Sequence, residues 1–134
     1  MKKVLITVLV IALIIVLLML SHLIGTGFSK RCDVVMINYS VSEDQTELTF
    51  ETSVLSSIGF IRGFEDSGGG VKPHYLTFYS TFGGLNSSFG AKHKFTLELG
   101  KDDTEIYFNR PDGGFELVLK KNKETNLWEC PDKK

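Results

Sequence analysis

The amino-acid sequence predicts an all-β domain, an antiparallel immunoglobulin-like sandwich of about seven strands, preceded by one hydrophobic helix. After residue 32, apolar and polar residues alternate in short runs separated by Gly, Ser, Asn and Asp, as in half-buried strands and their turns. Before residue 32 the chain is mostly apolar. We therefore divide it into residues 1–31, a membrane anchor or signal segment, and 32–134, an extracytoplasmic domain.

The N-terminal segment begins with Lys2 and Lys3 and continues with 21 residues, 4–24, that include no Asp, Glu, Lys or Arg. As a helix these residues would measure about 30 Å, enough to cross a bilayer core. A basic start before an apolar run is also typical of a secretory signal, and Gly25 and Gly27 would suit cleavage after Gly27. The apolar run is longer than that of most cleaved signals, which favours an uncleaved signal anchor.

The orientation of this helix rests on its flanking charges. Lys2 and Lys3 lie before it, and Lys30 and Arg31 lie after it, so the positive-inside rule is nearly balanced. The short N-terminal tail and the export-like segment place the domain outside. We expect a single-pass protein of the cell membrane, or a secreted protein if the segment is cleaved.

The charge of the domain limits its partners. Residues 33–134 carry 11 Lys and Arg and 16 Asp and Glu, a net charge of −5. Phosphates would repel such a domain, which argues against nucleic acid as a partner. The same net charge predicts no charge-driven adhesion to anionic lipid.

Four strands are expected in the first half of the domain. Alternation predicts strands at 35–41, 48–54 and 59–65; in the last of these, Phe60 shares a face with Arg62 and Phe64, and Ile61 lies on the other. Residues 74–80 have aromatic or β-branched residues on both faces, which is typical of a central strand.

The second half begins with a long connection, 81–92, that contains Gly, Ser and Asn. Strands are then expected at 95–99, 106–108 and 115–119, with a last short strand at Leu127 and Trp128 as an eighth. Arg110-Pro111-Asp112-Gly113-Gly114 predicts a hairpin turn, because Pro111 fixes φ and Gly113 accepts positive φ.

Several stretches resemble small uncharacterised proteins, mainly of Gram-positive bacteria, that pair one hydrophobic segment with one β-sandwich domain. The residues that carry the resemblance are 57–62, 75–86, 90–92 and 113–119, within a region that covers roughly half of the chain. The resemblance implies an exported, membrane-linked bacterial domain and implies no activity.

The connection 81–92 is the candidate ligand-binding loop, since loops that expose aromatic and amide groups on a rigid sandwich often bind ligands. The candidate residues are Phe82, Gly83, Gly84, Leu85, Asn86 and Phe89. The alternative is a crossover between sheets in which Phe82, Leu85 and Phe89 cap the core, and this alternative is favoured.

Cys32 and Cys130 lie at the two ends of the domain. An exported chain with two cysteines suggests a disulfide between them. Two free thiols, or pairing between chains, are the alternatives.

No catalytic, cofactor-binding or metal-binding residues are assigned. His74 and His93 stand at no recognisable spacing from a nucleophile or carboxylate, and surface histidines at strand ends are favoured. Asp102, Asp103 and Glu105 lack the order of a calcium loop, so a polar hairpin turn is favoured there.

These observations predict a non-enzymatic, membrane-tethered binding or interaction module. Its expected partners are the membrane, through residues 4–24, and an unknown protein or envelope polymer, reached through the 81–92 loop or an open sheet edge. The alternatives are an accessory subunit of a membrane complex that acts through its transmembrane helix, and a secreted binding or inhibitory domain.

Overall fold

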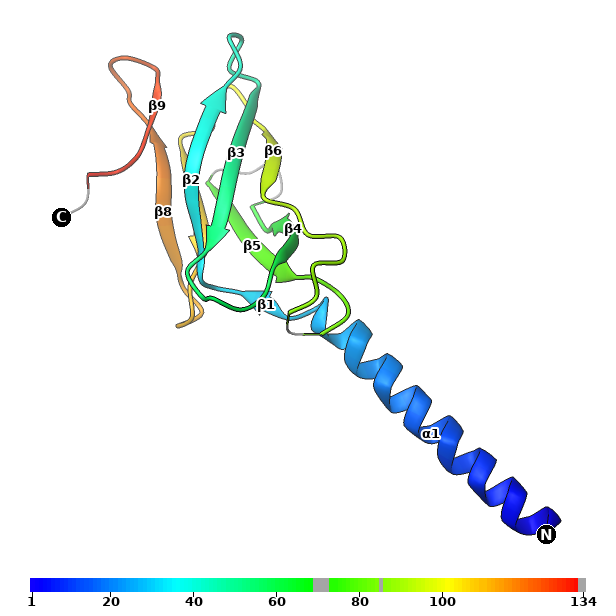
Figure 1. Ribbon diagram of the computed structural model, residues 1–134. Helices are drawn as coiled ribbons and strands as arrows, with labels where there is room; N and C mark the ends of the chain where they lie inside the picture. The colour runs from blue at the N-terminus through cyan, green and yellow to red at the C-terminus, as the bar shows by residue number, and fades with distance from the viewer. Residues whose placement is uncertain (69–72, 85, 133–134) are drawn as a thin grey trace.

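The computed structural model describes residues 1–68, 73–84 and 86–132. Within these residues one helix, α1 (Lys2–Thr26), projects from a β-domain (Figure 1). The strands are β1 (Lys30–Arg31), β2 (Val34–Val41), β3 (Glu47–Val54), β4 (Ile61–Asp66), β5 (His74–Ser80), β6 (Lys94–Glu98), β7 (Glu105–Asn109), β8 (Phe115–Lys121) and β9 (Trp128–Glu129).

Helix α1 is long and apolar enough to cross a membrane. None of its residues is buried against the β-domain, so its aliphatic side chains have no partner within the described chain. An apolar surface of this length needs lipid or another protein to cover it. The expected hydrophobic helix is therefore confirmed by its length and composition.

Two sheets make up the β-domain. The larger sheet has the order β1-β5-β7-β8-β9, and β4 also pairs with β5; the smaller sheet has the order β2-β3-β6. Strand β5 has β4 on one side and both β1 and β7 on the other. The prediction that residues 74–80 form a central strand is confirmed.

One hydrophobic core lies between the sheets. The ring of Phe50 on β3 contacts Phe108 on β7 at 5.9 Å and Phe64 on β4 at 5.7 Å between centroids. Phe78 on β5 contacts Phe108 at 4.6 Å. Burial of each such side chain contributes on the order of 1.5–3 kcal/mol, so these rings are a main reason that the sheets stay together.

The strand directions differ from the expected wholly antiparallel sandwich. Strand β5 pairs with β7 in parallel, because the chain leaves β5, crosses to the smaller sheet as β6 and returns as β7. The described residues form nine strands rather than seven or eight, since β1, a pairing of only two residues, was not predicted. The β-rich, two-sheet character is confirmed.

Two bulges also alter the expected faces. The register shifts between Met36 and Asn38 in β2, and between Ile61 and Gly63 in β4. An extra residue reverses the alternation beyond it. Ile37 is consequently exposed, whereas Ile61 and Phe64 pack on the same core. The prediction that Ile61 and Phe64 lie on opposite faces was wrong for this reason.

Two turns were predicted as hairpins. The turn at 110–114 joins the antiparallel strands β7 and β8, and Gly113 has a φ of 81°, which confirms that prediction. The turn at 100–104 is different, because it joins β6 in one sheet to β7 in the other. The hairpin prediction at Asp102 and Asp103 was therefore wrong, and this turn is a crossover between sheets.

Candidate functional site

The start of the 81–92 loop lies against the C-terminal end of α1. The backbone N–H of Gly83 donates to the carbonyl of Leu23 at 2.9 Å, and that of Gly84 donates to Oγ1 of Thr26 at 3.1 Å. The last carbonyls of a helix have no partner within the helix. This loop therefore supplies a hydrogen bond at a helix end that sequence alone left open.

Phe82 and Arg62 complete this junction. The ring of Phe82 meets that of Phe28 edge-on at 5.8 Å, and the Arg62 guanidinium lies 4.7 Å from the Phe82 ring centroid. Nε of Arg62 donates to the carbonyl of Gly27 at 2.8 Å. Gly27 is buried, and a Cβ there would lie 2.1 Å from the Phe82 ring, so only glycine fits the packing as it stands.

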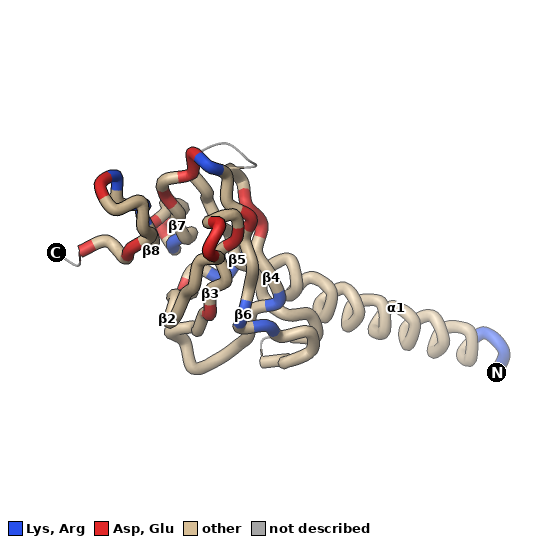
Figure 2. The backbone as a smooth tube through the Cα atoms, turned by 90° about the horizontal axis from the view of Figure 1, so that it is seen from above, with Lys and Arg blue, Asp and Glu red and all other residues tan. Residues whose placement is uncertain are grey.

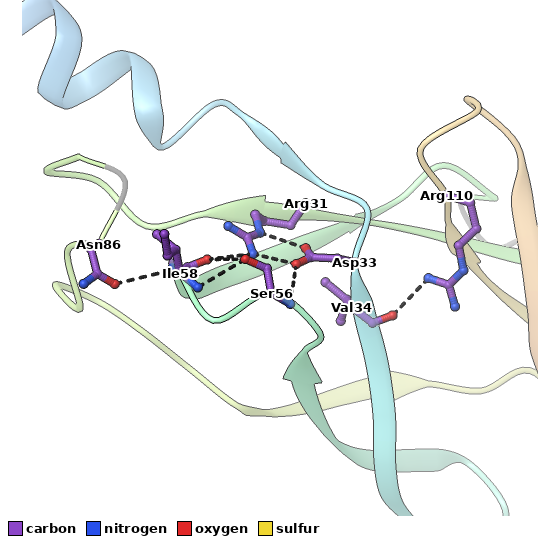
Figure 3. Close-up of polar contacts among 8 residues, drawn as sticks. Arg31, Asp33, Val34, Ser56, Ile58, Asn86 and Arg110 are labelled. Carbon is purple, nitrogen blue, oxygen red and sulfur yellow. Dashed lines mark hydrogen bonds and ion pairs between the residues drawn. The ribbon is translucent and has the colours of Figure 1, made fainter.

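A second set of polar contacts ties the β3–β4 loop to the beginning of the domain (Figure 3). Arg31 pairs with Asp33 at 2.8 Å and donates to the carbonyl of Ile58 at 3.1 Å. Asp33 accepts the backbone N–H of Ser56 at 3.1 Å. The side-chain oxygen of Asn86 accepts the N–H of Gly59 at 3.4 Å. The β3–β4 loop is thus bonded to the segment that follows α1, and the 81–92 loop is bonded in turn to the β3–β4 loop.

The residues of the predicted ligand loop thus have separate positions. Phe82, Gly83 and Gly84 face α1, and Asn86 bonds the β3–β4 loop. The crossover alternative had expected Phe89 to cap the core. Phe89 is instead 78% exposed. Leu85 lies outside the described residues. The loop does cross from one sheet to the other, since β5 and β6 belong to different sheets.

A groove of about 500 Å³ lies on another side of the domain, along β2 and β8. Its apolar lining includes Val35 and Met36 from β2, and Leu117 and Val118 from β8. Arg110, which donates to the carbonyl of Val34 at 2.9 Å and pairs with Glu116, also lines it. This hydrogen bond connects the two sheets beside the groove (Figure 3).

Both cysteines line the same groove. Each is a free thiol, with Cys130 exposed and Cys32 partly buried. Nδ2 of Asn109 donates to Sγ of Cys32 at 3.2 Å. The possible disulfide between them is not formed in this structure, yet the fold brings the two ends of the domain to one groove.

His74 is the main departure from the sequence analysis. It is 3% exposed, whereas a surface position had been expected. Nδ1 lies 2.6 Å from Oδ2 of Asp66, and Nε2 lies 2.7 Å from Oδ2 of Asp103. Asp66 also accepts the N–H of Gly68 at 3.0 Å. Both ring nitrogens therefore face carboxylates.

This arrangement sets the protonation of His74. Burial by itself lowers the pKa of the imidazole, but the hydrogen bonds that its N–H groups donate to Asp66 and Asp103, and the negative charges of these carboxylates, outweigh burial and raise the pKa above its ordinary value. An imidazolium with two donors matches two acceptor carboxylates. The cluster links the end of β4, the start of β5 and the β6–β7 turn.

Sequence spacing gave no indication of this cluster, because Asp66 and Asp103 lie 8 and 29 residues from His74. One signal was present: His74 has the same strand parity as Leu76 and Phe78, which are buried. His93, in contrast, is exposed as expected. Among the described residues no group of three His, Cys, Asp or Glu is arranged to hold a metal ion.

An open cleft beside the cluster has a volume of about 500 Å³, and its lining includes Thr96, Glu98 and Gly100 together with the three clustered residues. Comparison with known proteins gives no further guide to either site: no family model, no curated protein and no solved structure matches the chain.

Proposed function

We propose that the chain is a single-pass membrane protein whose extracytoplasmic sandwich domain is a non-enzymatic binding module. Its binding site is the apolar groove along β2 and β8, and its partner is a protein that inserts apolar side chains there. The observation that carries this proposal is the groove itself, which is open, about 500 Å³ in volume and lined by side chains of both sheets. An immunoglobulin-like topology and a bacterial origin remain parts of this proposal.

The junction supports an uncleaved anchor. Cleavage after Gly27 would remove the carbonyl that accepts Nε of Arg62 and the Leu23 carbonyl that accepts the N–H of Gly83. The ring of Phe82 would also lose the buried Gly27 on which it packs. These contacts exist only while α1 and the domain remain in one chain, which supports the uncleaved anchor. Secretion after cleavage is the alternative.

The groove is favoured over the 81–92 loop because the loop residues Gly83, Gly84 and Asn86 use their polar groups within the chain. The groove has apolar walls, which favours a protein partner over a hydrophilic envelope polymer. A non-enzymatic role is supported by His74, whose two ring nitrogens are both engaged by carboxylates, so neither is available to take a proton from a substrate.

A photocrosslinking residue at Leu117, in the full chain in its native host, tests this function. We expect one discrete crosslinked product, and we expect Val35→Arg to abolish it because a long, charged side chain would occupy the apolar part of the groove that the partner's apolar side chains enter. The matched control is the same probe at Lys101, an exposed position in the β6–β7 turn that does not line the groove. Equal products from both positions, or none from Leu117, would contradict the groove as the site.

The anchor is tested separately by the intact mass of the protein recovered from membranes. A mass that includes residues 1–27 supports the signal anchor. A soluble product that begins near Phe28 would contradict it and would make the secreted alternative the better one.

The accessory-subunit alternative is favoured by one observation, that no residue of α1 is buried. Replacement of residues 4–24 with an unrelated apolar span distinguishes the two roles. Retention of the Leu117 crosslink supports the domain as the binding element, whereas its loss would support the helix.

A further inference from the structure

Three segments that are separate in sequence meet where α1 ends: residues 27–31, residues 56–62, and residues 81–84 with 86–94. Gly83 bonds Leu23, and Arg62 bonds Gly27. Asn86 bonds Gly59 in turn. We call the surface formed by these three segments the membrane-proximal surface.

The charge of the membrane-proximal surface is the opposite of that of the rest of the domain. Its three segments contain no Asp or Glu and five basic residues, Lys30, Arg31, Arg62, Lys92 and Lys94. All 16 acidic residues of the chain lie elsewhere. Seen from above, blue segments lie beside β4 and β6 near the base of α1 (Figure 2).

The same segments expose large apolar side chains. Phe28 and Phe89 are 65% and 78% exposed, and Ile58 and Phe60 are 53% and 39% exposed. Scattered exposed apolar residues need no explanation. Here, however, four of them come from three segments held together at the exit of a membrane-length helix, among five basic residues. Two of these, Arg31 and Lys94, pair with the flanking Asp33 and Glu51.

We propose that the membrane-proximal surface rests on the bilayer that α1 crosses, with its apolar side chains at the level of the lipid headgroups and its basic side chains on anionic headgroups. This combination of apolar and basic side chains is typical of protein surfaces that lie in the membrane interface. The domain as a whole is acidic, and anionic lipid would repel it by net charge. Within a Debye length of the bilayer, however, the attraction between the nearby basic residues and the headgroups outweighs the repulsion of the more distant acidic residues.

Continuity with α1 is the reason to prefer lipid over a protein partner. The carbonyl of Leu23 and Oγ1 of Thr26 lie in the last turns of the helix and bond the 81–92 loop directly. If α1 spans the bilayer, this loop begins at the boundary between acyl chains and headgroups. The inference therefore rests on the membrane-spanning part of the proposed function and not on the groove.

The test uses the full chain reconstituted in phosphatidylcholine vesicles that carry brominated acyl chains, with or without phosphatidylglycerol. Phe89→Trp is made in a Trp128→Phe background, since the indole N–H of Trp128 has no hydrogen-bond partner among the described groups. We expect the emission of the residue-89 indole to be blue-shifted and quenched by bromine. The matched control is Leu127→Trp, a residue 61% exposed in the turn before β9, which should be neither shifted nor quenched.

Charge is tested with Lys30→Gln/Lys92→Gln, against Lys101→Gln/Lys123→Gln away from the junction. Contact with an anionic surface is worth roughly fivefold per basic residue, so the first pair should lower the ratio of docked to undocked domains by about 25-fold in phosphatidylglycerol vesicles, and the control pair should leave it unchanged. Flotation with the vesicles reports insertion of α1 by itself. Flotation without quenching at residue 89 would overturn this inference and leave the anchor intact. Failure to float would overturn the anchor. Quenching that is unchanged by both pairs of lysine substitutions would overturn the role of anionic lipid.

Discussion

Polar side chains are buried, wholly or in part, at both ends of the β-domain, the end next to α1 and the end at which β5 begins. The two ends differ in the groups that these side chains contact. Ser80, the last residue of β5, lies beside α1, since its N–H donates to the carbonyl of Ser29. His74, its first residue, lies about 20 Å away along the strand. At the first end an arginine meets aromatic rings and a backbone carbonyl. At the second, an imidazole is held between two carboxylates.

The difference has consequences for stability. Contacts of Arg62 with rings and a carbonyl involve no group that titrates near neutral pH. The cluster at His74 includes one, and it is buried, so that loss of either charge leaves the other uncompensated. We therefore expect the α1 end to respond to changes of shape and the His74 end to changes of charge.

The largest effect is expected at His74. His74→Leu removes the cation and leaves the carboxylates of Asp66 and Asp103 without it, which should lower the free energy of unfolding by about 3–5 kcal/mol. Urea unfolding of the full chain in detergent micelles, followed by the emission of the buried Trp128, measures this. The exposed His93, changed to Gln, is the control and should cost less than about 0.5 kcal/mol. A loss of similar size in both variants would show that the cluster is not specially stabilising.

The second effect tests shape at the α1 end. Gly27→Ala places a Cβ 2.1 Å from the ring of Phe82, so that the ring must move, at an expected cost of about 1–3 kcal/mol. Hydrogen exchange at the amides of Gly83 and Gly84, which bond α1, should become faster. Gly25→Ala is the matched control, because nothing lies within 4 Å of its Cβ position, and it should leave exchange unchanged. Equal protection in both variants would contradict the packing of Phe82 on Gly27.

The same comparison shows what the sequence could predict. Composition and alternation were sufficient for the apolar helix, the central strand at 74–80 and the hairpin at Gly113, because each of these depends on neighbours in the chain. The bulges at Ile37 and Arg62 were not predictable, since the extra residue is accommodated by a partner strand far away in sequence.

The sites were harder to predict than the fold for the same reason. Strand β6 crosses to the other sheet, and this brings the β6–β7 turn, with Asp103, onto His74. The 81–92 loop was recognised by its glycines and aromatic residues, but its contact with Thr26 depends on where α1 ends in space. Long-range contacts decided both sites, and no spacing motif records them.

The third prediction concerns pH. Because the pKa of His74 is raised in the folded state, its stabilising contribution is complete below the unfolded pKa of about 6.5 and is lost as pH rises through the folded pKa. The slope for one such group is at most about 1.4 kcal/mol per pH unit. Urea titration from roughly pH 6 to pH 9 measures the free energy of unfolding across the range in which a histidine of raised pKa titrates. Over this range the free energy of unfolding of the wild type should fall more steeply with pH than that of His74→Gln. Parallel curves would contradict a protonated His74.

The smallest effect is expected at Arg62, and it separates the two ends most directly. Arg62→Lys keeps the charge but loses the planar group that lies over Phe82 and donates to Gly27, so the cost should be about 0.5–2 kcal/mol. The control is Lys94→Gln, whose ion pair with Glu51 spans 3.8 Å between exposed groups and should contribute less than about 1 kcal/mol. Hydrogen exchange at Gly83 measures the junction in both variants. The effect of Arg62→Lys should be the same at about pH 6 and pH 8, because no carboxylate or imidazole takes part in the junction. These two pH values lie on either side of the ordinary histidine pKa, about 6.5. An effect that changed with pH would mean that the junction and the His74 cluster are coupled through β5.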